Sequence, residues 1–120
     1  MKKENIILDK SFEFALQIIE LYKQLVSEKE FVLSKQLLRS GTGIDANVEE
    51  ATAAISKKDF TAKMSIASKE ARETRYWLKL FQKSQLVKID ITKDLIEIEQ
   101  LINILTAIVK TSQGNGNVEL

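Results

Sequence analysis

The chain has 120 residues, a length that suits one domain with a single hydrophobic core. It contains no proline and only four glycines. Both residues are costly inside helices, so their scarcity favours long helices joined by short connections. The formal net charge of +1 excludes the global basicity that is typical of a dedicated nucleic-acid-binding domain.

Cysteine and histidine are both absent. Without cysteine there is no disulfide framework and no thiolate metal site, which suits a reducing cytosol. Without histidine the chain lacks the commonest general base, the usual transition-metal ligand and the Ser-His and Cys-His nucleophile pairs. We therefore expect a protein that is not an enzyme, with no catalytic residues and no cofactor.

The sequence begins with a charged Met1-Lys2-Lys3, but the apolar run Ile6-Ile7-Leu8 that follows is short. It is too short for a signal peptide or a membrane span. We expect a soluble cytoplasmic protein with no membrane partner.

Apolar residues recur with helical spacing in four blocks, of which the first two predict helices over about residues 11–27 and 30–55. The first block has two adjoining apolar rows, Phe14, Ile18, Leu21 and Leu25 beside Phe12, Ala15, Ile19, Tyr22 and Val26. The second block has the row Leu33, Leu37, Ile44, Val48, Ala51 and Ile55. Gly41 lies on the same line, so we expect this glycine to face the core.

The third and fourth blocks predict helices over about residues 58–84 and 92–111. Their apolar rows are Phe60, Met64, Ala67, Ala71, Thr74, Leu78 and Phe81, and Leu95, Ile98, Ile102, Leu105 and Val109. Short connections between long helices imply antiparallel neighbours. The predicted fold is all-α, an antiparallel up-down-up-down four-helix bundle over residues 1–112. Residues 113–120 have no periodic apolar face, which predicts a flexible C-terminal tail.

The element Gly41-Thr42-Gly43 interrupts the second predicted helix. A Walker loop needs a lysine and a Ser/Thr directly after its last glycine, and a dinucleotide fingerprint needs a third glycine at fixed spacing. This element has neither, so we interpret the glycines as sites of close backbone approach or of a local kink.

Two stretches resemble a known family, "SKQLLRSGTGIDANVEEA" and "SKKDFTAKMSIASKEARETRYWLKL". They are similar to the four-helix bundle proteins encoded in intervening sequences of bacterial 23S ribosomal RNA genes. The resemblance covers roughly residues 9–112 and rests on an Arg-Ser-Gly-Thr-x-Ile-x-Ala-Asn element followed by a Lys-Glu-Ala-x-Glu-Thr-x-Tyr-Trp-Leu element. Gly43 and Asp45 stand where we would expect serine and glycine.

The resemblance implies a homo-oligomeric bundle, a pentameric ring. A related fold is the accessory protein of diversity-generating retroelements, a basic pentamer that binds nucleic acid and a reverse transcriptase. The resemblance therefore implies self-association and leaves a nucleic-acid partner and a protein partner as the two candidates.

Charge is concentrated in the third predicted helix, where residues 57–83 carry eight basic against three acidic residues. Arg72, Arg75 and Lys79 lie on one side of this helix, and none has an acidic residue three or four positions away. We predict that they contact nucleic-acid phosphates. The alternative is that they pair with acids on another helix or subunit, such as Glu97 or Glu99.

A smaller basic pair, Lys35 and Arg39, lies on the second predicted helix and is a weaker candidate for phosphate contacts. A solvated face or an ion pair explains the two residues equally well. Apolar side chains on the third predicted helix fall beside its core row, which favours a subunit interface over a base-stacking platform. These interface candidates are Ile66, Tyr76, Trp77 and Leu80.

Four-helix bundles can hold dinuclear metals through Glu and Glu-x-x-His ligands, but this chain has no histidine. We interpret Glu49, Glu50, Glu70 and Glu73 as members of ion pairs and predict no metal site. The function predicted from the sequence is a non-enzymatic homo-oligomer that binds RNA or another nucleic acid. The alternative is a structural or protein-interaction oligomer with no nucleic-acid role.

Overall fold

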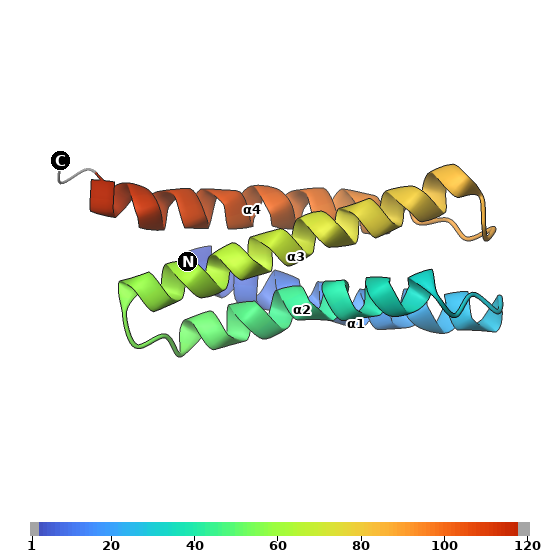
Figure 1. The fold of residues 1–120 in the computed structure, drawn as a ribbon, viewed down its shortest axis with the longest axis horizontal. Helices are drawn as coiled ribbons and strands as arrows, with labels where there is room; N and C mark the ends of the chain where they lie inside the picture. Colours follow the sequence, from blue (N-terminus) through green and yellow to red (C-terminus); the bar gives the residue numbers. More distant parts are fainter. Residues whose placement is uncertain (1–2, 118–120) are drawn as a thin grey trace.

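The computed structural model describes the backbone of residues 3–117 and the side chains of residues 6–114. Four helices make up this part of the chain, α1 (Lys3–Ser27), α2 (Leu33–Thr52), α3 (Lys57–Ser84) and α4 (Thr92–Asn117) (Figure 1). They run lengthwise in an elongated molecule of 52 × 25 × 24 Å. Short turns join them at alternate ends, which confirms the predicted antiparallel arrangement.

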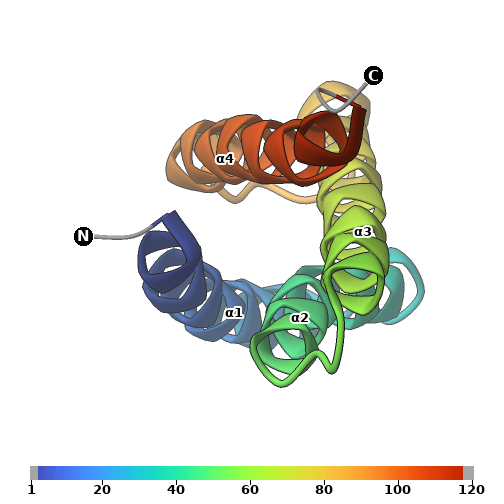
Figure 2. The ribbon, with the colours of Figure 1, turned by 90° about the vertical axis from the view of Figure 1, so that its left-hand side faces the viewer.

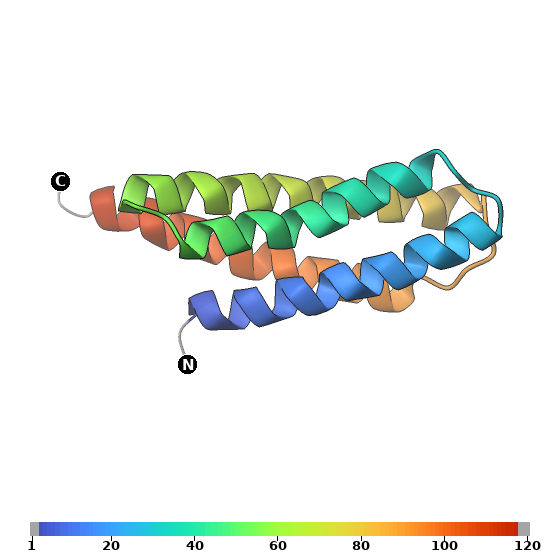
Figure 3. The same cartoon turned by 90° about the horizontal axis from the view of Figure 1, so that it is seen from below.

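Helices that follow one another in sequence pack side by side, and α1 and α4 close the bundle (Figures 2 and 3). The contact between α1 and α4 is the loosest of the four. In the described chain, α1 and α3 lie diagonally across the bundle and make no contact, and the same holds for α2 and α4. The outer faces of α1 and α3 are therefore on opposite sides of the molecule.

The core consists largely of the predicted apolar rows, and two of the differences lie at helix ends. Ile7 is fully buried and continues the first row toward the N-terminus, which is why α1 begins about two turns earlier than predicted. The prediction that Ile55 belongs to the second core row is wrong, because α2 ends at Thr52 and Ile55 is 95% exposed. The chain turns there toward α3, whose N-cap Ser56 accepts a hydrogen bond from the Asp59 N–H.

Helix α4 also extends beyond its predicted end. It continues to Asn117, through five residues that the sequence assigned to the tail. Near this end the hydroxyls of Thr61 and Ser112 are hydrogen-bonded, which ties the last turns of α4 to the first turns of α3. The rest of the predicted tail, residues 118–120, lies outside the described residues, and its flexibility stays a prediction.

Turns at the opposite end of the bundle from Ile55 are held by local polar contacts. The Glu30 carboxylate accepts hydrogen bonds from the backbone N–H groups of Val32, Leu33 and Ser34 at 2.6–3.1 Å, which satisfies the first N–H groups of α2. Gln85 adopts a left-handed conformation with φ of 56° and ends α3. These contacts define where α2 begins and where α3 ends, and α3 carries most of the candidate site.

Candidate nucleic-acid interface

Helix α3 buries one side and exposes a basic row on the other. Met64, Ala67, Ala71 and Leu78 are completely buried in the core. The opposite side carries four exposed cations around one exposed aromatic residue, and we call this set the α3 row. Its members are Lys69, Arg72, Tyr76, Lys79 and Lys83. Among the described residues, none of the four cations makes an ion pair.

Arg75 does not belong to this row, although the sequence grouped it with Arg72 and Lys79. Its Nη1 atom donates to Glu99 Oε1 of α4 at 2.6 Å, and its side chain is only 28% exposed. This is one of the two acids that the sequence offered as an alternative partner. The charge of Arg75 is therefore neutralised within the bundle.

Arg72 and Lys79 remain available to a ligand. The Nη2 atom of Arg72 donates to Thr106 Oγ1 at 3.0 Å, a neutral partner that orients the guanidinium and leaves its charge uncompensated. Lys79 lies one turn from Tyr76 and is exposed. Both cations follow the side of α3 that faces α4.

The two basic residues of α2 have different environments. Arg39 lies against α3, where Nη1 is 3.4 Å from Glu70 Oε1 and Nη2 pairs with Glu73. Lys35 is exposed and, in the described part of the chain, makes no ion pair. Only Lys35 of this pair could meet phosphate without first breaking an internal contact.

The contact of Arg39 joins the two sequence elements that carry the family resemblance. Glu73 also accepts a hydrogen bond from the Trp77 indole N–H at 3.1 Å. At the next residue of each helix, on the core side, the buried Thr74 hydroxyl donates to Ser40 Oγ at 2.8 Å. These elements therefore hold α2 against α3, which is a structural role and explains why they occur together.

The four residues predicted to form a subunit interface are unequally exposed. Tyr76 is 54% exposed and Ile66 is 43% exposed, whereas Trp77 and Leu80 are half-buried. The rings of Tyr76 and Trp77 meet edge to face, with centroids 4.9 Å apart. Tyr76 therefore offers a supported aromatic surface in the middle of the basic row.

Lys69 and Lys83 are site residues that sequence reasoning did not assign. Each lies seven residues from Tyr76, so both fall on its side of the helix. This spacing was the signal that could have found them. At about 1.5 Å per residue the row extends over about 21 Å.

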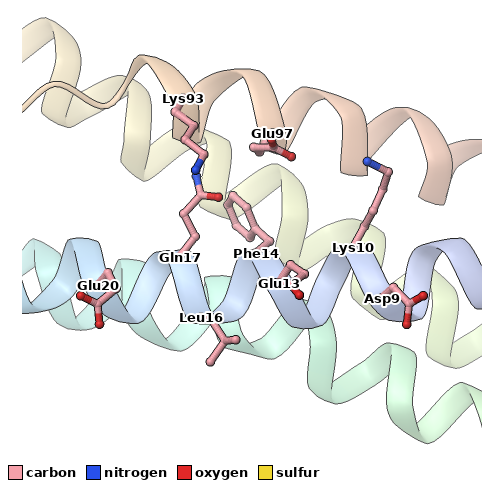
Figure 4. Close-up of a pocket in the computed structure, with 9 residues that line it drawn as sticks. All are labelled: Asp9, Lys10, Glu13, Phe14, Leu16, Gln17, Glu20, Lys93 and Glu97. Atoms are coloured by element: carbon pink, nitrogen blue, oxygen red, sulfur yellow. The ribbon is translucent and has the colours of Figure 1, made fainter.

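A second surface that the sequence did not predict follows the outside of α1. Phe12, Leu16 and Ile19 belonged to or adjoined the predicted apolar rows, but they are 51%, 46% and 38% exposed. Next to them, between α1 and α4, is an open hollow of about 460 Å³ (Figure 4). Four carboxylates and two lysines contribute to its lining, namely Asp9, Glu13, Glu20, Glu97, Lys10 and Lys93. This side of the molecule is acidic, whereas the α3 row is basic.

Two further classes of site are absent from the described residues. No group of three or more carboxylates gathers as the ligands of a metal ion would. Within the same residues, no helix has an apolar stretch long enough to cross a bilayer.

The model of the family described as 23S rRNA-intervening sequence protein matches residues 3–107. Among solved structures, the chain is similar to a protein of unknown function from the S23 ribosomal protein family of Bacteroides thetaiotaomicron. The two are 45% identical with a TM-score of 0.85, and the match covers 91% of this chain and 99% of the other. No curated protein matches the chain.

Proposed function

We propose that this chain, which belongs to the 23S rRNA-intervening sequence protein family, is a non-enzymatic, self-associating bundle that binds RNA or another nucleic acid. The α3 row is the binding surface. Its cations contact phosphates, and Tyr76 stacks on a base. The absence of cysteine suits a reducing compartment, and we place this activity in the cytoplasm.

One observation carries the proposal, the exposure of four uncompensated cations on a single helix face. The two other arginines of the chain, Arg39 and Arg75, are paired with carboxylates of the bundle, whereas no cation of the row is, across the residues that the structure describes. Single-stranded nucleic acid is bound by such a combination, a basic track that follows the backbone and an aromatic ring that accepts any base. No base-edge contact is invoked, so the expected binding has little sequence preference.

The experiment measures the anisotropy of a labelled single-stranded RNA during titration with the protein. In the variant Arg72→Glu/Lys79→Glu, two of the four phosphate contacts are lost. At physiological salt the expected affinity is lower by about tenfold or more, from the counterions that those two contacts no longer release.

A matched control is Lys57→Glu/Lys58→Glu, which makes the same change in net charge at exposed positions outside the α3 row. The control should retain nearly all of the affinity. Equal losses in the two double variants would mean that binding depends on net charge alone. If the α3 double variant binds RNA with unchanged affinity, or if the unmodified protein does not bind RNA, the proposed function is wrong. The structural or protein-interaction oligomer then remains as the alternative.

Tyr76 gives a second, independent test of the binding surface. Replacing Tyr76 by Ala removes a stacking partner that is worth about 1–3 kcal/mol per base, so RNA affinity should fall at least about fivefold. The salt dependence should stay the same because no phosphate contact is removed. A loss that disappears when the RNA is replaced by an abasic strand would identify stacking as its cause, and no loss with either strand would exclude it.

A further inference from the structure

The outer face of α1 combines an apolar row with an acidic row. Phe12, Leu16 and Ile19 are spaced by four and three residues, so they form one continuous exposed stripe. Glu13 and Glu20 run beside it on the side of the α1–α4 hollow, whereas Leu16 points away from α4 (Figure 4). The described contacts of the bundle leave this stripe uncovered.

The outer face of α3 has the complementary pattern. Tyr76 is exposed and Leu80, one turn later, is half-buried. Arg72 and Lys79 run beside them on the side of α4, which Arg72 contacts through Thr106. The two cations are seven residues apart, the same separation as Glu13 and Glu20 on α1. Two turns of helix thus separate each pair, a distance of about 10 Å.

We propose that α1 of one copy packs in parallel along α3 of a second copy. In this register the acidic row meets the basic row, Glu13 facing Arg72 and Glu20 facing Lys79, and the apolar stripe meets Tyr76 and Leu80. Asp9 then lies near Lys69 as a third pair. Lys23 approaches Lys83, a like-charged contact that Glu20, 3.3 Å from Lys23 in its own chain, offsets only in part because it also faces Lys79.

The parallel orientation follows from the order of the rows around each helix. At about 100° per residue, Glu13 and Glu20 lie clockwise of the apolar stripe of α1 when it is viewed from its N-terminus, whereas Arg72 and Lys79 lie anticlockwise of Tyr76 on α3. When two parallel helices face each other, the clockwise flank of one lies beside the anticlockwise flank of the other. An antiparallel pair would instead place the acids against the apolar residues.

A symmetric contact of α1 with α1 is disfavoured by the same charges. In an antiparallel pair centred on Leu16, Glu13 of each copy would lie beside Glu20 of the other, and like charges repel. A contact between two different faces leaves one face of each copy free for the next copy. Because α1 and α3 are parallel within the bundle, such a chain of contacts keeps all bundle axes aligned and can close into a ring.

This contact uses the α3 row, so a second copy and nucleic acid would exclude one another. That consequence rests on the proposed function, but the contact itself does not. Assembly would keep the basic surface covered until nucleic acid competes for it.

Cysteine crosslinking tests the contact directly, because the chain has no cysteine of its own. The single variants Leu16→Cys and Tyr76→Cys are oxidised separately and as an equimolar mixture, without nucleic acid. Only the mixture should give a two-chain band on non-reducing gels. A Leu16→Cys variant that crosslinks to itself would overturn the proposal in favour of a symmetric contact, and a mixture that stays uncrosslinked would overturn it outright.

Charge exchange gives a second readout, with mass measured by light scattering. Glu13→Lys/Glu20→Lys and Arg72→Glu/Lys79→Glu should each be monomeric. Their mixture should associate again, and the variant with all four changes should regain the mass of the unmodified assembly. The matched control Glu28→Lys/Glu49→Lys changes two exposed carboxylates elsewhere and should assemble normally. A monomeric unmodified protein, or double variants that do not rescue each other, would contradict the contact.

The two proposals fail separately in these experiments. Crosslinking without RNA binding would retain the contact and remove the proposed function. RNA binding by a chain that does not crosslink would retain the proposed function and remove the contact. If both the contact and the proposed function hold, added RNA should lower the mass of the assembly. An assembly that binds RNA with no change in mass would refute the inference that RNA and a second copy compete for the α3 row.

Discussion

Gly41 and Gly43 are two residues apart on α2, yet their surroundings differ. A Cβ atom at Gly41 would lie 2.9 Å from both Cγ1 and Cγ2 of the fully buried Ile18, which has no room to move. A Cβ atom at Gly43 would lie 2.8 Å from Oε2 of Glu70, the end of a flexible side chain. The first glycine is needed for close packing of α1 on α2, and the second is not.

Replacing each glycine by Ala separates these two roles. Gly41→Ala should lower the free energy of unfolding by about 1–2 kcal/mol, because overpacking of the core exceeds the gain of about 1 kcal/mol in helix propensity. Gly43→Ala should stay within about 1 kcal/mol of the unmodified protein, since Glu70 can turn aside. Urea denaturation measures both, and equal destabilisation of the two variants would contradict the packing argument.

At the same scale, sequence periodicity predicted which side of each helix is buried, Gly41 included, but it did not separate Arg72 from Arg75. The two arginines lie on the same side of α3 and have equivalent sequence neighbours. Which of them meets a carboxylate depends on the register of α4 against α3, and that register is set by tertiary packing. The same reason explains why Arg39 was not recognised as the partner of Glu70 and Glu73.

Helix α4 packs loosely on α1, and Asp94 lies at this contact. The residue is 7% exposed, and its carboxylate accepts a hydrogen bond from Gln17 Nε2 of α1 at 2.8 Å. Burial raises the pKa of Asp94 above its ordinary value of 3.8, although the hydrogen bond and Lys93 act in the opposite direction. Ionisation of Asp94 is therefore less favourable in the folded protein than in the unfolded chain.

The sign of the pH dependence follows from this shift. As pH rises from about 3.8, Asp94 ionises in the unfolded chain before it ionises in the folded protein. The free energy of unfolding therefore falls until the pH passes the folded pKa of Asp94, and above that pH this loss of stability stays constant. Asp94→Asn keeps an acceptor for Gln17 and removes the cost. It should therefore melt at a higher temperature than the unmodified protein at pH 7, with the advantage lost near pH 3.

Asp90 is a control of opposite sign for this experiment. It is exposed, and its carboxylate accepts hydrogen bonds from the hydroxyl of Thr92 at 2.7 Å and from the backbone N–H of the same residue at 3.0 Å, which lower the pKa of Asp90. Asp90→Asn should lower the melting temperature at pH 7 and lose this effect in acid. A rise in both variants would show that the result reflects overall charge and not burial.

The four elements themselves were predictable, because long apolar rows with helical period leave few alternatives in a chain without proline. Several errors lie at the helix ends, where the apolar period can continue past the residue at which a turn ends the helix. Ile55 fits the period of α2 but follows the turn that Ser56 and Asp59 establish. The sequence also predicted one wide buried face on α1, whereas Phe12 and Ile19 of its second row lie too far around the helix from the first row and are exposed on the outer face.

At the scale of the whole molecule, acidic and basic surfaces lie on opposite sides. This separation explains how a chain with a net charge of +1 can still present a basic face. The family resemblance is confirmed by the match to residues 3–107 and by the related structure. Self-association and nucleic-acid binding stay predictions, and both now depend on the same row of side chains.

The salt dependence of RNA affinity is a direct measure of phosphate binding by the α3 row. Four phosphate contacts on a single strand predict a slope of about −3 for log affinity against log salt, so affinity should fall about 50-fold between about 50 and 200 mM salt. Arg72→Glu/Lys79→Glu should reduce the slope to about half. A slope near zero, or one that this variant leaves unchanged, would contradict phosphate binding by the α3 row.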